Sequence, residues 1–337
     1  MNLFQRAISV TTSLLALSLS AAQAAALDKP LEVIVFPGGF NWPIFVAEEK
    51  GFFAAEGIAV NVTPTPDSKY QMVNFIDGKF DIAMTAMDNV VAYAEGQGAA
   101  PTQATPDIVA FMGSDNGFLR LVSIPEVKTV ADLKGKRVGV DALTTGYAFV
   151  LREMLELGGL NPAEFEYVQA GGVMKRFEAL MQKSFAATLL ISPFEAAAQR
   201  DGFNILANGS EALGAYQGVV GAVRRDWAKE NGDKLVSYIR GYQAALDWLY
   251  NPANKDEAIQ ILLKSVQGMK EPVAQASYQI LLDDKLGFYK RPTIDEKGVA
   301  TVLALRSKYA EPKKELADPT HYYDTQYLER ALAAPKP

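Results

Sequence analysis

The stretch Leu31-Glu32-Val33-Ile34-Val35-Phe36 is followed by a helical pattern at 43–55 and by the apolar run Ile58-Ala59-Val60-Asn61-Val62. A strand, a helix and a second strand in this order indicate two parallel strands joined by a crossover helix. The same rhythm continues in a helix expected at 67–77, a strand at 80–84, a helix at 87–95 and a strand at 108–112. The pattern predicts an α/β fold.

A second series of such units follows, and it predicts a second lobe. We expect strands at 118–123, 137–140, 165–168 and 187–191, and helices at 147–157, 173–183 and 194–200. From about residue 217 onward the pattern is helical, with one apolar stripe formed by Leu235, Ile239, Tyr242, Leu246 and Leu249. We therefore expect residues 27–115 and 217–337 to form one lobe and residues 116–216 the other. Crossings near 115–117 and 214–218 are expected to act as hinges.

The first 26 residues have the features of a secretory signal. They hold one charge, Arg6, then an apolar stretch at 7–19, then Ala22-Gln23-Ala24 in an A-x-A pattern. Serine and threonine interrupt the apolar stretch, and it is shorter than the roughly 20 residues that span a membrane. We expect cleavage after Ala24 or Ala26 and an exported mature chain. The complete lack of cysteine fits a bacterial periplasm, where free thiols would oxidise.

Composition disfavours several classes of protein. The 337 residues carry 33 Lys and Arg against 39 Asp and Glu, a net charge of −6, which argues against nucleic acid as a partner. There is no cysteine and one histidine, His321, so thiol nucleophiles and Cys/His metal sites are excluded. The motifs HExxH, GxxxxGKS/T and GxGxxG are absent. We expect no catalysis, no cofactor and no metal.

Several motifs resemble those of one known family, in the family's order. They are Glu48-Glu49-Lys50-Gly51-Phe52-Phe53-Ala54-Ala55-Glu56-Gly57-Ile58, Gly78-Lys79-Phe80-Asp81-Ile82-Ala83, Val130-Ala131-Asp132-Leu133-Lys134-Gly135-Lys136-Arg137-Val138-Gly139-Val140, Thr144-Thr145-Gly146-Tyr147 and Gly158-Gly159-Leu160-Asn161-Pro162. The chain resembles periplasmic solute-binding proteins of ABC importers for nitrate, sulfonate, taurine and the thiamine pyrimidine precursor. The resemblance implies a two-lobed type II periplasmic-binding-protein fold, a ligand between the lobes, an inner-membrane ABC permease as partner and a monomer.

Enzymes of the same fold are the main alternative. Fungal pyrimidine-synthesising enzymes also resemble this chain, but that resemblance implies a cysteine-rich motif and a catalytic histidine, and the chain has only His321. Cytoplasmic menaquinone-pathway enzymes share the fold, and the expected signal segment argues against them. A receptor that presents its ligand to a membrane sensor is a further alternative.

Candidate ligand-binding residues follow the expected strands, where helix N-termini direct free N–H groups outward. They are Phe40, Asn41, Trp42, Asp88, Asn89, Asp115, Asn116, Thr144, Thr145, Gly146, Tyr147, Phe194 and Glu195. Helix caps and turns explain many of the same residues. Phe194 also fits core packing.

The charges in these segments suggest the kind of ligand. They include Asp88, Asp115, Asp141 and Glu195 but no Lys or Arg, which disfavours a small, highly charged anion. We expect a ligand with an amine or ring N–H, an apolar or aromatic body and one anionic end held by amides at 144–147. An organosulfonate or taurine is favoured over a pyrimidine-like or aromatic heterocycle.

Overall fold

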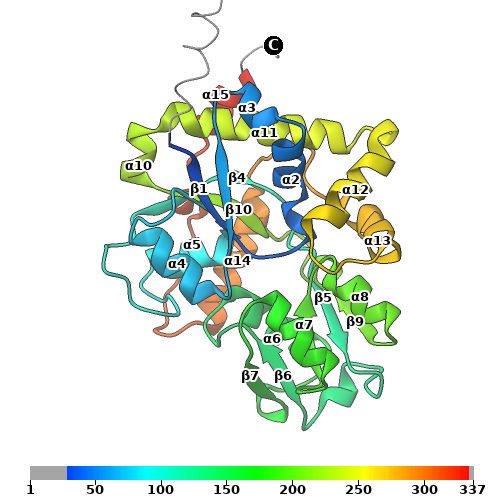
Figure 1. Cartoon of the computed structure of the whole chain (residues 1–337). Coiled ribbons are helices and arrows are strands. Elements are labelled where there is room, and N and C mark those ends of the chain that lie inside the picture. The colour runs from blue at the N-terminus through cyan, green and yellow to red at the C-terminus, as the bar shows by residue number, and fades with distance from the viewer. Residues whose placement is uncertain (1–28, 334–337) are drawn as a thin grey trace, which may run out of the picture.

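The computed structural model describes residues 29–333, so the expected signal segment lies outside the described residues. Two five-stranded sheets form two lobes, stacked one above the other in Figure 1. We call the part built on the first sheet lobe 1 and the part built on the second sheet lobe 2. Within the described residues, no helix is long and apolar enough to cross a membrane.

The sheet of lobe 1 has the order β2-β1-β3-β10-β4. Its strands are β1 (Leu31–Val35), β2 (Val60–Pro64), β3 (Ile82–Ala86), β4 (Ile108–Gly113) and β10 (Val219–Arg224). β1 runs parallel to β2 and β3, with Val33 opposite Val62 and Ile82. The expected parallel units are therefore present, and their carboxyl ends point toward lobe 2.

β10 was not predicted, because the sequence after residue 217 was expected to be helical. The run Val219–Arg224 instead returns to lobe 1 and pairs antiparallel with both β3 and β4. Five of its six residues are buried, so it lies in the middle of a sheet covered on both faces. A short apolar run of this kind fits a buried strand and a helix segment equally well, and long-range pairing decides between them.

The sheet of lobe 2 has the order β7-β6-β8-β5-β9. Its strands are β5 (Arg120–Ser123), β6 (Arg137–Val140), β7 (Glu166–Gln169), β8 (Ala187–Leu190) and β9 (Asn204–Asn208). β6 is parallel to β7 and β8, whereas β5 is antiparallel to β8 and β9. Both lobes thus carry one antiparallel strand in an otherwise mostly parallel sheet.

Helices cover both sheets and fill the C-terminal part of lobe 1. The α-helices are α2 (Trp42–Glu49), α3 (Phe52–Ala55), α4 (Ser68–Ile76), α5 (Met87–Ala94), α6 (Gly146–Leu157), α7 (Val173–Met181), α8 (Phe194–Arg200), α9 (Gly209–Leu213), α10 (Arg225–Glu230), α11 (Gly232–Leu249), α12 (Lys255–Ser265), α13 (Glu271–Leu281), α14 (Glu296–Tyr309) and α15 (Gln326–Ala333). Five 3-10 turns complete the order, at Gly39–Asn41, Ala131–Leu133, Pro162–Glu164, Pro252–Asn254 and Pro319–Tyr322. The long helix α11 crosses the end of lobe 1 far from lobe 2 (Figure 1).

The single helix expected at 43–55 is two helices. Gly51 lies between them with φ of 71°, in the left-handed region that glycine enters without strain, so the chain turns there. The apolar pattern runs across this turn, which is why periodicity alone did not reveal it.

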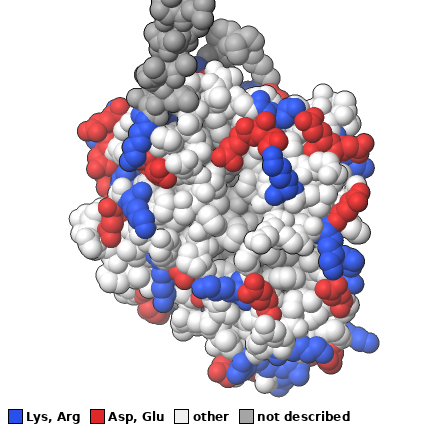
Figure 2. Space-filling view, viewed as in Figure 1, with Lys and Arg blue, Asp and Glu red and all other residues white. Residues whose placement is uncertain are grey.

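The chain passes between the lobes twice, at 114–119 between β4 and β5 and at 214–218 between α9 and β10. The two crossings lie side by side, since the Gly218 N–H donates to the Asp115 carbonyl at 2.9 Å. A Cβ at Gly218 would lie 2.1 Å from the Gly117 nitrogen, so this close approach requires glycine. The surface in Figure 2 carries interspersed basic and acidic side chains around a broad uncharged area.

Candidate functional site

A cavity of about 40 Å³ lies between the lobes, at the carboxyl ends of the strands. Hydrogen bonds between the lobes surround it: Gly39 N–H donates to Ser192 O at 3.1 Å, and Gly172 N–H donates to Pro66 O at 3.2 Å. One buried water needs roughly 10–15 Å³, so the cavity has room for only a few waters. The direct hydrogen bonds between the lobes indicate a closed arrangement.

The start of α6 forms one polar wall. Thr145 precedes the helix in an extended conformation, and its hydroxyl donates to Ala142 O at 2.9 Å. Within the described residues, the N–H groups of Gly146 and Tyr147 have no recorded protein acceptor, and both residues line the cavity. The first N–H groups of a helix carry partial positive charge. This end of α6 can therefore receive an anionic group.

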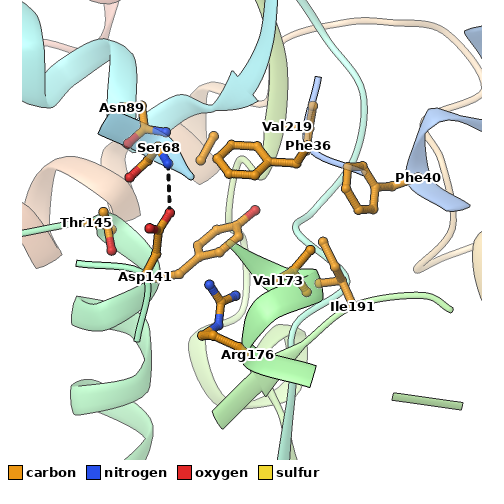
Figure 3. Close-up of a pocket in the computed structure, with 13 residues that line it drawn as sticks. Phe36, Phe40, Ser68, Asn89, Asp141, Thr145, Val173, Arg176, Ile191 and Val219 are labelled. Carbon is orange, nitrogen blue, oxygen red and sulfur yellow. Dashed lines mark hydrogen bonds between the residues drawn. The ribbon is translucent and has the colours of Figure 1, made fainter. Parts of the chain in front are cut away.

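Arg176 from α7 adds a full positive charge to the same cavity. Its side chain is nearly buried, with 5% of the residue exposed, and it donates to Gly171 O at 2.9 Å and Leu189 O at 3.3 Å. These bonds leave other guanidinium N–H groups available, and Figure 3 shows the guanidinium directed toward the other cavity residues. The segments singled out from the sequence hold no Lys or Arg, and Arg176 adds a cation to the cavity from outside them. Arg176 lies near the start of the helix expected at 173–183, but no local motif distinguishes it from a surface arginine.

Asp141 and Ser68 face each other from opposite lobes. The Ser68 N–H donates to Asp141 Oδ2 at 3.1 Å (Figure 3). Burial raises the pKa of Asp141, and the nearby Arg176 guanidinium opposes that shift. The Ser68 hydroxyl is buried without a hydrogen-bond partner among the described residues. The cavity thus offers a carboxylate and an unsatisfied hydroxyl in addition to the cationic groups.

The remaining wall is apolar. Phe36 and Phe40 contribute aromatic rings from the loop after β1, and Val173, Ile191 and Val219 contribute aliphatic side chains (Figure 3). A pocket with an apolar body and a few convergent polar groups is typical of sites for small organic ligands. Asn89 lines the same cavity and donates from Nδ2 to Thr85 Oγ1 at 2.9 Å.

The structure brings some of the predicted site residues together at this cavity. Its lining includes Phe40, Asn89, Thr145, Gly146 and Tyr147. Residues that were not predicted also line it: Phe36, Ser68, Ala86, Val173, Arg176, Ile191 and Val219. Phe36 lies at the end of an expected strand and Ser68 at the start of an expected helix. The expectation that ligand residues follow the strands therefore pointed to their vicinity.

Trp42 and Asn41 lie outside this cavity. Trp42 is fully buried in lobe 1, where its Nε1 donates to Ala258 O at 3.1 Å and its ring meets Tyr278 edge to face at 6.0 Å. Asn41 shapes the loop by donating to Phe36 O and Gly38 O, and it lines a separate groove of about 600 Å³ between the lobes. The path of the backbone after residue 38 places the side chains of both Asn41 and Trp42 outside the cavity.

The other predicted residues do not line the cavity, because protein groups already engage them. Asp88 accepts two hydrogen bonds from Arg306, which also donates to the Thr144 carbonyl. Asp115 and Asn116 organise the first crossing by accepting from the N–H groups of Gly117 and Phe118. Phe194 packs against Phe177 at 5.4 Å, and Glu195 accepts from the Ser192 hydroxyl.

Asp115 and Glu195 predict an unusual pH dependence of stability. Both are fully buried, and burial raises the pKa of each to about 6 from ordinary values of 3.8 and 4.5. Because the folded protein holds these protons more tightly than the unfolded chain does, protonation stabilises the fold. The stabilisation is complete at a pH below the pKa of the unfolded chain, and it is lost as the pH rises through the folded-state pKa of about 6. We expect the free energy of unfolding to increase from pH 7.5 to pH 5, by about 1.4 kcal/mol for each carboxyl, because pH 5 lies one unit below the folded pKa.

Chemical denaturation at the two pH values measures this difference. The double variant Asp115→Asn, Glu195→Gln is the control, because it cannot take up these protons and should lose most of the dependence. A parent protein that is equally stable at both values, or less stable at pH 5, would contradict the assignment.

Comparisons with solved structures place this architecture among periplasmic binding proteins. The alkanesulfonate-binding protein SsuA of Xanthomonas axonopodis pv. citri, solved with MOPS bound, is 18% identical with a TM-score of 0.67, and the likeness covers 85% of this chain and 93% of that one. The nitrate-binding protein NrtA of Synechocystis PCC 6803 is 14% identical with a TM-score of 0.71, covering 91% and 89%. These likenesses show the type II periplasmic-binding-protein fold.

Sequence comparison points in the same direction. YtlA of Bacillus subtilis strain 168, a candidate binding protein, is 24% identical over 225 residues, which are 64% of this chain and 65% of that protein. The chain thus spans somewhat less than two thirds of this relative. The family model described as NMT1/THI5 like matches residues 41–255, more than half of the chain and every strand of the two sheets except β1. The chain belongs to the NMT1/THI5-like family.

Proposed function

We propose that this protein is an exported solute receptor that closes its lobes on a small organic acid and delivers the acid to an ABC permease in the inner membrane. One observation carries the ligand assignment: a nearly buried arginine, Arg176, and the open N-terminus of α6 line the same interlobe cavity. Two cationic features at one site favour an anionic group on the ligand. Family and fold support the receptor role.

An organosulfonate or taurine is the ligand that we favour. Its sulfonate would accept hydrogen bonds from Arg176 and from the Gly146 and Tyr147 amides, and its carbon chain would lie against Phe36 and Phe40. An amine, as in taurine, would be balanced by Asp141. The Xanthomonas relative whose name is alkanesulfonate-binding protein supports this choice through a shared fold.

A pyrimidine-like or aromatic heterocycle is the second candidate. Asp141 and the unpartnered Ser68 hydroxyl favour it, because they can bond ring N–H groups and ring nitrogens. The two phenylalanine rings offer faces on which a flat ring can stack. The two candidates differ in the residue they need most, which is Arg176 for the acid and Asp141 for the heterocycle.

We also propose the lobe boundaries from the strand order. Residues 27–115 and 217–337 would form lobe 1 and residues 116–216 lobe 2, with the hinges at the two adjacent crossings. Ligand then shifts the equilibrium between open and closed forms only through contacts that it makes with both lobes at once.

A ligand panel tests the receptor role. At 100 times its Kd, a cognate solute should add about 2.7 kcal/mol to stability. For a chain of this length that raises Tm by several degrees. We expect a shift with one or more sulfonates, none with nitrate, and recovery of the solute chemically unchanged after incubation. A panel of sulfonates, amino acids, pyrimidines and aromatic acids that gives no shift would contradict the proposal, and chemical conversion of the solute would favour an enzyme.

A further inference from the structure

The lobes also meet at a buried contact outside the ligand cavity, where α5, α14 and α6 come together. Asp88 lies in the first turn of α5, Arg306 lies near the end of α14, and both belong to lobe 1. The side chains are almost completely buried, with 0% of Arg306 and 2% of Asp88 exposed. We call this contact the α5–α14–α6 junction. An ion pair buried so completely has lost its water, so the loss of either partner leaves an uncompensated charge.

The pair is bidentate and reaches across to lobe 2. Arg306 donates from Nε to Asp88 Oδ1 at 2.8 Å and from Nη2 to Asp88 Oδ2 at 2.6 Å. Nη2 also donates to the Thr144 carbonyl of lobe 2 at 2.9 Å, and Nη1 donates to Gln97 at 3.3 Å. The guanidinium also lies 5.0 Å from the centre of the Phe149 ring on α6.

Lobe 2 approaches the pair through a glycine. A Cβ at Gly146 would lie 2.3 Å from both Cβ and Cγ of Asp88, closer than two carbon atoms can pack. Gly146 is the first residue of α6, and its φ is not in the left-handed region, so the glycine is explained by the close approach rather than by the backbone. Thr144 and Gly146 therefore contact the Asp88–Arg306 pair directly.

We propose that Arg306 is a positioning residue that controls closure: the buried Asp88–Arg306 pair is the platform on which the start of α6 docks when the lobes close. Opening the lobes exposes the pair to water and breaks the Arg306 contacts with Thr144 and Phe149. Closing them restores both contacts and presents the Gly146 and Tyr147 amides to the ligand. The junction thus sets how much of the protein is closed before any ligand binds.

Spin-label distance measurements test this without a ligand, so the result is independent of the proposed substrate. The chain has no cysteine, and Lys69→Cys on α4 with Glu178→Cys on α7 places two exposed labels on opposite lobes. In this background we expect a dominant short distance. Arg306→Gln should lower the ratio of closed to open molecules at least about tenfold, because Asp88 can then be hydrated only in the open form. Gly146→Ala should do the same by steric contact.

A double variant separates the charge from general damage. Asp88→Asn with Arg306→Gln removes both charges, and we expect it to recover much of the closed population that Arg306→Gln loses. Lys308→Ala is the matched control, since Lys308 also links α14 to Glu153 on α6 but is 48% exposed, and it should change the ratio less than about twofold. If Arg306→Gln does not fold, Gly146→Ala and the double variant still decide the outcome.

Equal distance distributions for the parent and a folded Arg306→Gln variant would overturn the proposal. So would a double variant that is as open as Arg306→Gln alone, because the closed state would then depend on something other than charge balance. An unchanged Gly146→Ala distribution would show that the lobes do not meet at this junction.

Discussion

Trp42→Ala should lower the free energy of unfolding by about 3–5 kcal/mol, as large-to-small changes of fully buried aromatic residues do. The ring is fully buried, packs edge to face on Tyr278, and donates a hydrogen bond to Ala258 O, all within lobe 1. The substitution leaves a cavity and removes the indole hydrogen bond to Ala258 O. Urea denaturation measures the loss.

Trp248→Ala is the matched control for Trp42. Trp248 is only partly buried and lies beneath Lys50 near the surface, so the loss there should be clearly smaller. Ligand affinity, measured on the fraction of Trp42→Ala that remains folded, should be nearly unchanged because the ring lies outside the cavity. A stable Trp42→Ala protein with abolished binding would instead return this residue to the ligand site.

Arg176→Gln should weaken binding of an anionic solute about 30-fold or more. Removing one partner from a buried, hydrogen-bonded charge contact costs about 2–5 kcal/mol, and 1.4 kcal/mol is a tenfold change in Kd. The change also removes the positive charge that offsets the effect of burial on the pKa of Asp141. A negatively charged ligand beside Asp141 is then less favourable. Isothermal calorimetry with the solute from the ligand panel gives the affinities.

Arg200→Gln is the matched control for Arg176, because it removes the same charge from an exposed position at the end of α8 in the same lobe. We expect its affinity to stay within about twofold of the parent, as for other exposed charges. Melting points without ligand show whether Arg176→Gln loses stability with its bonds to Gly171 and Leu189. A folded Arg176→Gln variant that binds with full affinity, together with a large loss of affinity in Asp141→Asn, would contradict an acidic ligand. It would favour the heterocyclic ligand instead.

Local periodicity was sufficient for most of the fold. The apolar runs at β1, β2 and β3 alternate with helical patterns, and such βα units pack into parallel sheets whatever the details of their side chains. The strand-end rule located the loops around residues 40, 88 and 145, since backbone direction follows from strand order. β10 was not predicted, because the segment becomes a strand only by pairing with β3 and β4, more than 100 residues earlier in the chain.

The sequence by itself determined the two series of βα units, the family resemblance and the segments that reach the cleft. Only the tertiary structure decided which side chains in those segments line the interlobe cavity. Asp88 illustrates the reason: its position at a helix start suits a ligand contact, but Arg306, 218 residues away, occupies both carboxylate oxygens. Arg176 shows the converse, because the packing of α7 against β8 and α8 within lobe 2 places an ordinary helical arginine at the cavity. The direction of a side chain between the lobes depends on contacts with residues that are distant in the sequence. Local sequence patterns carry no information on those contacts.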